Sequence, residues 1–222
     1  MKRSFDSIAH PYQKLEYFFF GDLLERVRAH HLPSISPQSQ TALLIGDGDG
    51  RFAESLLQTL PHLQIDSIDS SSTMLEIARK RLDNPPSFQP IFANALTHSY
   101  PDSQYDLIAL NFVVDCFTQE QFDFLKPKLQ ATLKPNGQLL YSDFAYTQSR
   151  FRNLLIQTLY LLFFGATALE TRALPQTRWR SDFTVQAAKT WLNGALTSQL
   201  LKNKSGANDR RRENIAILLR AD

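Results

Sequence analysis

The chain has 222 residues, enough for one domain with a full hydrophobic core or one domain with a small cap. Its 43% hydrophobic and 21% charged residues are ordinary for a globular protein, and its formal charge of +2 is too small to favour nucleic acid as a partner. Cys116 is the only cysteine, which excludes an internal disulfide and a cysteine-based zinc site, and no metal site is expected. Asp6 stands where a signal peptide would need an apolar core, so we expect a cytoplasmic protein.

Helical and strand patterns alternate along the first two thirds of the chain. Apolar residues at helical spacing predict a helix over 12–30. After a loop rich in Pro and Ser, the expected strands are 42–45, 63–69, 88–93, 106–112 and 138–144, and the expected helices are 51–60, 72–82 and 119–133. Serines 70–72 offer hydroxyl groups to cap the second of these helices. This alternation predicts an α/β fold with a mostly parallel sheet and helices on both faces.

The last third of the chain departs from this alternation. Residues 150–169 and 183–192 have helical patterns, whereas 195–202 and 215–220 predict two strands. A polar segment without a helical pattern joins these strands, so we expect an antiparallel pair. The apolar stretch 154–169 is too short to cross a bilayer.

Three glycines follow the first expected strand. Gly46, Gly48 and Gly50 are spaced G-x-G-x-G, and a strand that runs through glycines into a helix presents bare backbone amides to a ligand. Arg51 occupies the place of the third glycine of a dinucleotide fingerprint, which disfavours a nicotinamide-dependent oxidoreductase. Asp69 ends the second expected strand, where a carboxylate can accept hydrogen bonds from both hydroxyl groups of a ribose. The two features together predict an adenosine-type cofactor, and a tight turn without a ligand is the alternative.

Five sequence blocks resemble, in order, the class I S-adenosylmethionine-dependent methyltransferases. They are TALLIGDGDGRFAESLL, IDSIDSSSTMLEIARKRL, FANAL, YDLIALNFVVDCF and LKPNGQLLYSDF. The opening FDSIAHPYQKLEYFFFG resembles the ubiquinone/menaquinone-biosynthesis-type branch of that family. The resemblance implies a Rossmann-like seven-stranded sheet with an antiparallel C-terminal strand and a helical cap. It also implies S-adenosyl-L-methionine as cofactor and S-adenosyl-L-homocysteine as product.

The resemblance further implies which residues contact the cofactor. They are Gly46, Gly48 and Gly50 at the methionine part, Asp69 at the ribose, Ser70 and Met74 at the adenine, Asn94 and Ala95 at the adenine amino group, and Asn111 at the methionine end. The loop departs from the family at Leu44, where many relatives carry an acidic residue. Asp47 and Asp49 are also unusual, and one of them is a candidate to replace that carboxylate near the cofactor's ammonium group. A degraded site that binds the cofactor without catalysis, as in a regulatory or scaffold protein, is the alternative.

In this family the acceptor is bound beyond the ends of the fourth and fifth strands. Residues of this chain at those positions, with two from the N-terminal segment, are Phe112, Asp115, Cys116, Tyr141, Asp143, Tyr146, His10 and Tyr12. Asp115 is the leading candidate for a base, and Tyr12 is placed over the cofactor. Asp115 as a helix cap near residue 119, or as a solvated loop charge, is the alternative. No Asn/Asp-Pro-Pro-Tyr run occurs at 111–114, which counts against nucleobase and glutamine acceptors.

The expected organisation is a single methyltransferase domain. Its parts are an N-terminal helical segment (1–36), a cofactor-binding core (37–146), a helical cap (147–192) and a C-terminal strand pair (193–222). The cap suggests a small or medium hydrophobic acceptor, methylated by in-line displacement. For the apolar stretch 154–169, a buried core helix and a peripheral helix resting on lipid are the alternatives. No nucleic-acid partner is expected, and the oligomeric state is open.

Overall fold

The computed structural model describes residues 20–145, 175–177, 179 and 183–204. The helices are α2 (Leu23–Ala29), α3 (Arg51–Thr59), α4 (Ser72–Arg81) and α5 (Gln119–Thr132), with short 3-10 helices η2 (Leu32–Ser34), η3 (Val114–Cys116) and η4 (Leu192–Gly194). The strands are β1 (Thr41–Ile45), β2 (Gln64–Asp69), β3 (Phe88–Phe92), β4 (Tyr105–Asn111), β5 (Leu133–Phe144), β6 (Phe183–Trp191) and β7 (Leu196–Asn203). These bounds agree with the expected strands and helices of the core within a few residues, apart from the earlier start of β5.

The seven strands form one sheet in the order β3-β2-β1-β4-β5-β7-β6. Neighbours from β3 to β5 are parallel, and β7 is antiparallel to both β5 and β6. The predicted mostly parallel sheet with an antiparallel C-terminal strand is therefore confirmed. The strand order reverses at β1, which lies between β2 and β4. In open parallel sheets such a reversal leaves a crevice for ligands at the carboxyl ends of the strands.

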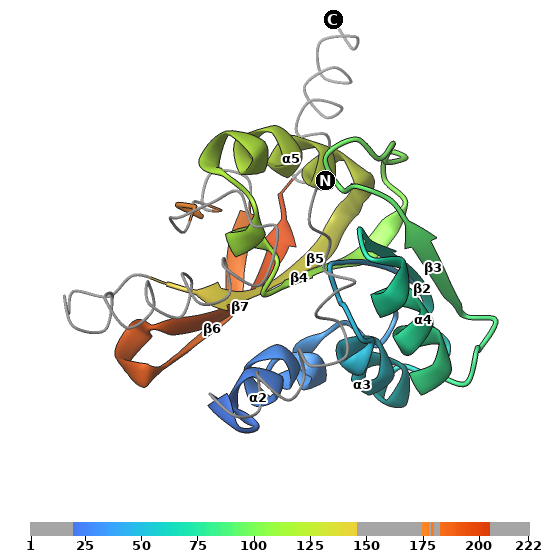
Figure 1. Ribbon diagram of the computed structural model, residues 1–222. Helices are drawn as coiled ribbons and strands as arrows, with labels where there is room; N and C mark the ends of the chain where they lie inside the picture. The colour runs from blue at the N-terminus through green and yellow to red at the C-terminus, as the bar shows by residue number, and fades with distance from the viewer. Residues whose placement is uncertain (1–19, 146–174, 178, 180–182, 205–222) are drawn as a thin grey trace, which may run out of the picture.

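Helices cover both faces of the sheet, because successive side chains of each strand point to opposite faces. Leu43 and Ile45 of β1 join the hydrophobic cluster that includes the inward side of α5. Ala42 and Leu44 join the other cluster, which includes residues of α3 and α4. Figure 1 shows the same division, with α5 on one side of the sheet and α2, α3 and α4 on the other. β4 is buried along nearly its whole length, as expected for a strand covered on both faces.

Two expectations about the ends of the core are wrong. Residues 183–192 were expected to be helical, but Phe183–Trp191 is strand β6, paired with β7 along the edge of the sheet. The expected helix over 12–30 is interrupted: Gly21 has a φ of +57° and the described helix starts at Leu23. A left-handed residue cannot continue a right-handed helix. The second expected C-terminal strand (215–220) and most of the expected cap (147–174) lie outside the described residues.

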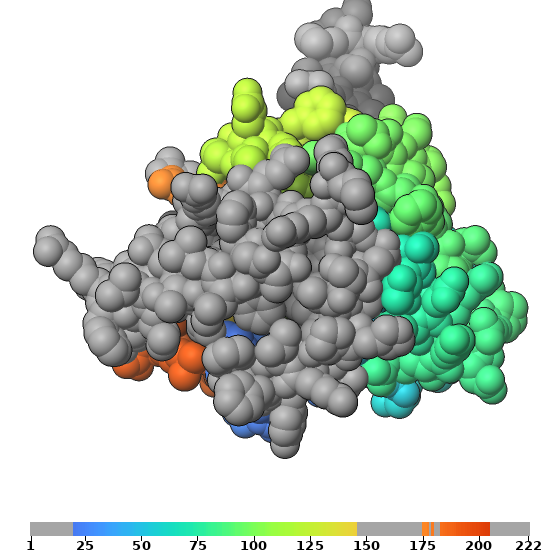
Figure 2. Space-filling view, viewed as in Figure 1, coloured from blue at the N-terminus to red at the C-terminus, as the bar shows by residue number. Residues whose placement is uncertain are grey.

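One edge of the sheet is β3, which carries Pro90 near its middle. Proline has no N–H to donate to a ladder, so it fits an edge strand. Phe92 at the end of this strand is 68% exposed. Figure 2 shows this part of the chain, in green, along the right-hand border of the molecule. None of the helices in the described ranges is both long and apolar enough to span a membrane.

Candidate functional site

The glycine loop joins β1 to α3 in a left-handed backbone conformation. Gly46, Gly48 and Gly50 have φ angles of +67°, +64° and +80°. A Cβ on Gly46 would lie 2.4 Å from Cγ2 of Val113, and one on Gly50 would lie 2.8 Å from Cβ of Ala78. Around Gly48, only one described atom comes within 4 Å, at 3.9 Å. Packing therefore requires two of the glycines, whereas the described residues leave open space around the third.

Asp69 lies beside that open space at the end of β2. Its Oδ2 accepts a hydrogen bond of 3.2 Å from the N–H of Gly48, and its Oδ1 accepts one of 2.9 Å from the N–H of Ser71. Ser71 caps α4 by accepting from the N–H of Met74, as the serines at 70–72 predicted. Met74 is buried and its sulfur faces Gly48, whereas Ser70 is exposed. The structure thus brings the predicted ribose carboxylate and one adenine-side residue to the glycine loop.

The segment after β3 lies next to Asp69, because the N–H of Ala93 donates to the backbone carbonyl of Asp69 (3.1 Å). Asn94 is exposed, and its Oδ1 already accepts a hydrogen bond of 2.9 Å from the N–H of Leu96. Ala95 is buried. An amide oxygen has two lone pairs, so the bond within this turn leaves room for a second donor. Contact of Asn94 and Ala95 with an adenine stays a prediction.

Asn111 ends β4 at the point where the strand order reverses. Its neighbour Leu110 pairs with Ile45, the residue before Gly46. The side chain is only 6% exposed, and its Oδ1 is buried without a hydrogen-bond partner in the described part of the chain. A buried acceptor without a partner costs roughly 1–3 kcal/mol. This oxygen therefore marks a place where a donor from a ligand fits.

The two aspartates of the loop have different surroundings. Asp49 is buried and pairs with Nε of Arg51 (3.0 Å) and with Nη2 of Arg81 (3.2 Å). Asp47 is half-buried, and its Oδ2 accepts a hydrogen bond of 3.1 Å from the N–H of Ala53 in the first turn of α3. Asp49 is thus neutralised by two guanidinium groups, whereas Asp47 is bound to the backbone of a helix N-terminus.

The carboxyl group of Asp47 is hard to ionise in the ligand-free protein. Burial raises the pKa of Asp47 from 3.8 to about 7, opposed by the hydrogen bond from Ala53. The negative charges of Asp49 and Asp69 raise this pKa further, and the guanidinium of Arg28 on α2 lowers it. A cation placed beside Asp47 would remove much of this penalty.

Asp115 is neither a cap of the helix that begins at residue 119 nor a solvated loop charge. It lies in η3 and is buried, so it is not a solvated loop charge. The cap of α5 is Thr118, which forms a capping box with Gln121. The position of Asp115 thus leaves its proposed role as a base open.

A second carboxyl group, that of Asp143 on β5, lies against Asp115. Its Oδ2 accepts a hydrogen bond of 3.2 Å from the N–H of Asp115, and its Oδ1 accepts one of 2.8 Å from the N–H of Phe144. Burial and the nearby charge of Asp115 raise the pKa of Asp143 well above its ordinary value. Burial also raises the pKa of the neighbouring Cys116 thiol. The sequence predicted Asp143 near the acceptor, but nothing in it indicated this pairing, because Asp115 in η3 and Asp143 on β5 are 28 residues apart.

Aromatic side chains gather at the carboxyl ends of β4 and β5. The rings of Phe112 and Phe144 are 5.4 Å apart, and that of Phe20 is 5.6 Å from Phe144. The guanidinium of Arg28 lies 5.0 Å from the centre of the Phe112 ring. These rings pack with Leu24 and Val27 of α2 and with Leu196, and so form an apolar cluster at the carboxyl ends of β4 and β5. Three other residues expected there, Tyr12, His10 and Tyr146, lie outside the described residues.

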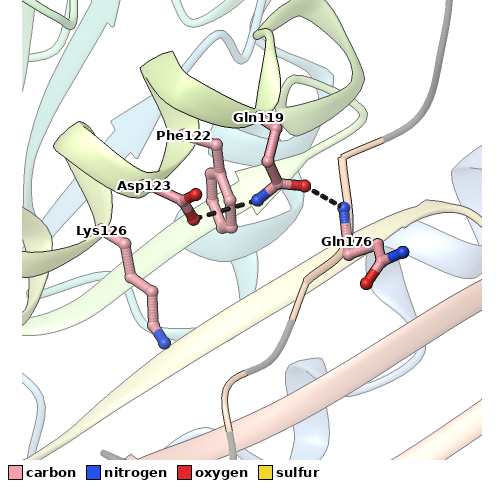
Figure 3. A pocket seen from close by; sticks show the side chains of 5 residues that line it. All are labelled: Gln119, Phe122, Asp123, Lys126 and Gln176. Atoms are coloured by element: carbon pink, nitrogen blue, oxygen red, sulfur yellow. Dashed lines mark hydrogen bonds between the residues drawn. The ribbon is translucent and has the colours of Figure 1, made fainter.

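A hollow of about 510 Å³ lies elsewhere, between α5 and the segment around Gln176. Figure 3 shows its lining, which comes from one helix and a neighbouring segment: Gln119, Phe122, Asp123, Lys126 and Gln176. The side chain of Gln119 bridges Oδ1 of Asp123 (3.0 Å) and the backbone N–H of Gln176 (2.7 Å). None of the described lining residues comes from the glycine loop or the strand ends, so we do not assign this hollow to the cofactor.

Residues 42–137 match a family described as methyltransferase domain. A malonyl-[acyl-carrier protein] O-methyltransferase of Halalkalibacterium halodurans is 28% identical over 155 residues, which are 65% of this chain and 54% of that protein. A demethylmenaquinone methyltransferase of Thermotoga maritima is 37% identical over 113 residues, which are 50% of this chain and 47% of that protein. The chain thus spans about half the length of these curated relatives.

Solved methyltransferase structures share the fold. A mitomycin 7-O-methyltransferase superposes with a TM-score of 0.64 at 15% identity, covering 90% of this chain and 60% of that one. An N-methyltransferase of Bradyrhizobium japonicum in complex with S-adenosyl-L-homocysteine gives 0.57 at 17% identity, covering 81% and 87%. With the sheet order and the glycine loop, these matches define a methyltransferase fold. The family match over residues 42–137, the curated relatives and the shared fold support a class I S-adenosylmethionine-dependent methyltransferase of the small-molecule type.

Proposed function

We propose that this protein transfers a methyl group from S-adenosylmethionine to a small or medium hydrophobic acceptor. The observation that carries the proposal is the buried oxygen of Asn111, which has no partner among the described residues and lies next to a glycine loop that those residues leave open at Gly48. Both lie at the strand reversal where ligands bind in this class of sheet. The carboxylate of Asp69, oriented by two backbone N–H groups, supports an adenosine-type ligand at the same place.

The residues proposed to hold the cofactor follow the order of the strands. Asp69 would accept the ribose hydroxyl groups, and Met74 with Ser70 would border the adenine. Asn94 and Ala95 would contact the adenine edge, since they follow β3 directly beside Asp69. Gly46 and Gly50 leave no room for a side chain, so the loop can keep its close packing. We propose that these two residues contact the methionine part of the cofactor with their backbone atoms.

Asp115 is the proposed base when the acceptor is protic. When bound, S-adenosylmethionine supplies a methyl group on a sulfonium, which a nucleophile takes in line while sulfur keeps the electron pair of the broken bond. A hydroxyl nucleophile must also lose its proton. Two adjacent buried carboxyl groups do not both ionise readily, and the pKa of Asp143 is the one raised well above its ordinary value. Protonation is therefore favoured at Asp143, and Asp115 is the group that we propose accepts the proton from the acceptor.

The acceptor side favours an uncharged molecule. The carboxylate proposed at Asp115, buried beside Asp143, would repel an anionic acceptor such as a malonyl group. The rings of Phe112 and Phe144 offer an apolar wall instead. Of the two relatives described above, the methyltransferase named for demethylmenaquinone is thus the better guide to the acceptor class. A hydrophobic phenol or quinol is the acceptor class that we infer, because its hydroxyl group can give its proton to a carboxylate base.

Ligand binding tests the cofactor. Thermal-shift titration should show that S-adenosylmethionine and S-adenosylhomocysteine raise the Tm of the full chain, whereas NAD does not. An oxidoreductase would show the reverse, and a chain that responds to neither sulfur ligand contradicts the proposal. Incubation with methyl-labelled cofactor and fractionated cell extract then tests the acceptor. Label is expected in the lipid-extractable fraction, and label only in protein or RNA refutes a hydrophobic acceptor. Binding without any transfer would instead support an inactive cofactor-binding protein.

The ribose assignment is tested with a pair of variants of β2. Asp69→Ala should weaken cofactor binding by roughly 1–3 kcal/mol, because charge-assisted hydrogen bonds are lost. Asp66→Ala is the control, since Asp66 lies on the same strand but accepts a hydrogen bond of 2.6 Å from the hydroxyl of Tyr105. Calorimetry should find cofactor affinity reduced in the first variant and retained in the second. Equal affinities of the Asp69 variant and the natural protein would disprove the assignment.

A further inference from the structure

The methionine part of S-adenosylmethionine carries an α-ammonium group, which needs acceptors when it is buried. Leu44, where many relatives have an acidic residue, cannot supply one. It is 1% exposed and packs in the hydrophobic cluster with residues of α3. Another group of this chain must therefore receive that cation if the proposed function is right.

Of the two loop aspartates, Asp49 is already engaged. Its carboxylate contacts the guanidinium groups of Arg51 and Arg81, and its backbone carbonyl accepts a further hydrogen bond of 2.9 Å from Nε of Arg81. A second cation would find little attraction there, because the two arginines already outweigh the single negative charge.

Asp47 has the opposite surroundings. It follows Gly46 at the end of β1, and its Oδ2 is bound to the N–H of Ala53. The charged groups that act on it are the carboxylates of Asp49 and Asp69 and the guanidinium of Arg28. Because Asp49 is itself paired with two arginines, the attraction for a cation beside Asp47 comes from the carboxylates of Asp47 and Asp69, opposed by the guanidinium of Arg28.

The amide oxygen of Asn111 supplies a second acceptor. Leu110 pairs with Ile45 across the parallel strands, so Asn111 and Gly46 are the next residues of the same two strand ends. The Oδ1 of Asn111 is buried without a partner in the described residues. One carboxylate and one neutral oxygen at adjacent strand ends are a suitable pair for an ammonium group with three N–H donors.

We propose that Asp47 and Asn111 together hold the α-ammonium group of the cofactor, and that binding is coupled to loss of a proton from Asp47. The inference rests on the proposed function. In the ligand-free protein near neutral pH, burial and the neighbouring carboxylates keep part of Asp47 protonated. The arriving ammonium group favours the ionised form, so the proton leaves as the cation binds. Below neutral pH this release opposes binding.

Calorimetry of the full chain with two ligands tests the coupling. S-adenosylhomocysteine carries the α-ammonium group, whereas 5′-methylthioadenosine shares its adenosine and thioether but lacks the amino-acid part. Affinity for S-adenosylhomocysteine should rise about tenfold between pH 6 and pH 8, because a proton with a pKa near 7 no longer has to be removed. Affinity for 5′-methylthioadenosine should not change. At pH 7 the binding heat of the first ligand should depend on the ionisation enthalpy of the buffer.

Three variants assign the effect to residues. Asp47→Asn should lose both the pH dependence and about tenfold or more of the affinity for S-adenosylhomocysteine at pH 8. Asn111→Ala should lose affinity for this ligand but keep the pH dependence. Asp49→Asn is the matched control, in which the pH dependence should remain. Binding of 5′-methylthioadenosine should persist in Asp47→Asn and Asn111→Ala, which shows that each is folded.

The outcomes separate this inference from the proposed function. If the natural protein binds neither ligand, the proposed function fails. If it binds both, but affinity for S-adenosylhomocysteine is independent of pH and unaffected by Asp47→Asn, the function stands and the inference is refuted. If Asp49→Asn abolishes the pH dependence and Asp47→Asn does not, the inference is also refuted, because the wrong aspartate has been assigned.

Discussion

Replacing Asp47 by asparagine should stabilise the ligand-free protein, and more so as the pH rises. The pKa of Asp47 is about 7 in the folded chain and 3.8 as a free side chain. The folded state therefore binds a proton between these values that the unfolded state has released, and wild-type stability falls as the pH rises toward 7. Each pKa unit corresponds to about 1.4 kcal/mol, so the two units between pH 5 and pH 7 amount to about 2–3 kcal/mol. The introduced asparagine carries no charge, and its amide oxygen can still accept from the N–H of Ala53.

Urea unfolding of both proteins at pH 5 and pH 8 measures this effect. The stability of the variant relative to the natural chain should increase by about 2–3 kcal/mol between the two pH values. Titration of other groups cancels in the comparison, because both proteins contain them. A difference that stays constant with pH would refute the reasoning, as would a variant that is the less stable protein at pH 8. The first result would mean that the carboxyl group of Asp47 is already ionised at pH 5.

Two further predictions concern stability. Gly46→Ala should destabilise the fold by about 2–4 kcal/mol, because the new Cβ meets Cγ2 of Val113 at 2.4 Å and the backbone is left-handed. Gly48→Ala should cost only about 1–2 kcal/mol, since that position has a similar φ but no close contact; equal losses in urea unfolding would contradict the packing argument. Burial raises the pKa of Asp106, but hydrogen bonds from Lys134 (2.8 Å) and from backbone N–H groups outweigh it and lower the pKa overall. Asp106→Asn should therefore cost about 1–2 kcal/mol at pH 7, and this deficit should shrink as the pH falls below 4; a deficit independent of pH would show that the charge is not involved.

Locally encoded features were predictable from the sequence. Ser71 caps α4 because its hydroxyl and the N–H that it accepts are only three residues apart. The central strands β1 and β4 carry continuous apolar runs, and the left-handed loop after β1 is marked by its three glycines. β6 was not predictable in this way. Most of its residues are exposed, so they carry little strand pattern, and its hydrogen bonds to β7 are what make it a strand.

The sequence alone predicts the order of strands and helices from β1 to β5, the glycine loop and the acidic residue at the end of β2, because these depend on neighbouring residues and on short periods. The difference between the two loop aspartates comes from the tertiary structure. Arg81 reaches Asp49 from a position 32 residues away on α4, and no comparable arginine contact neutralises Asp47 among the described residues. The tertiary structure also brings Asp143 against Asp115 and leaves the buried oxygen of Asn111 without a partner in the described part of the chain. Ion pairing, desolvation and hydrogen bonding act through space, so the chemistry of these carboxyl groups depends on which strands become neighbours.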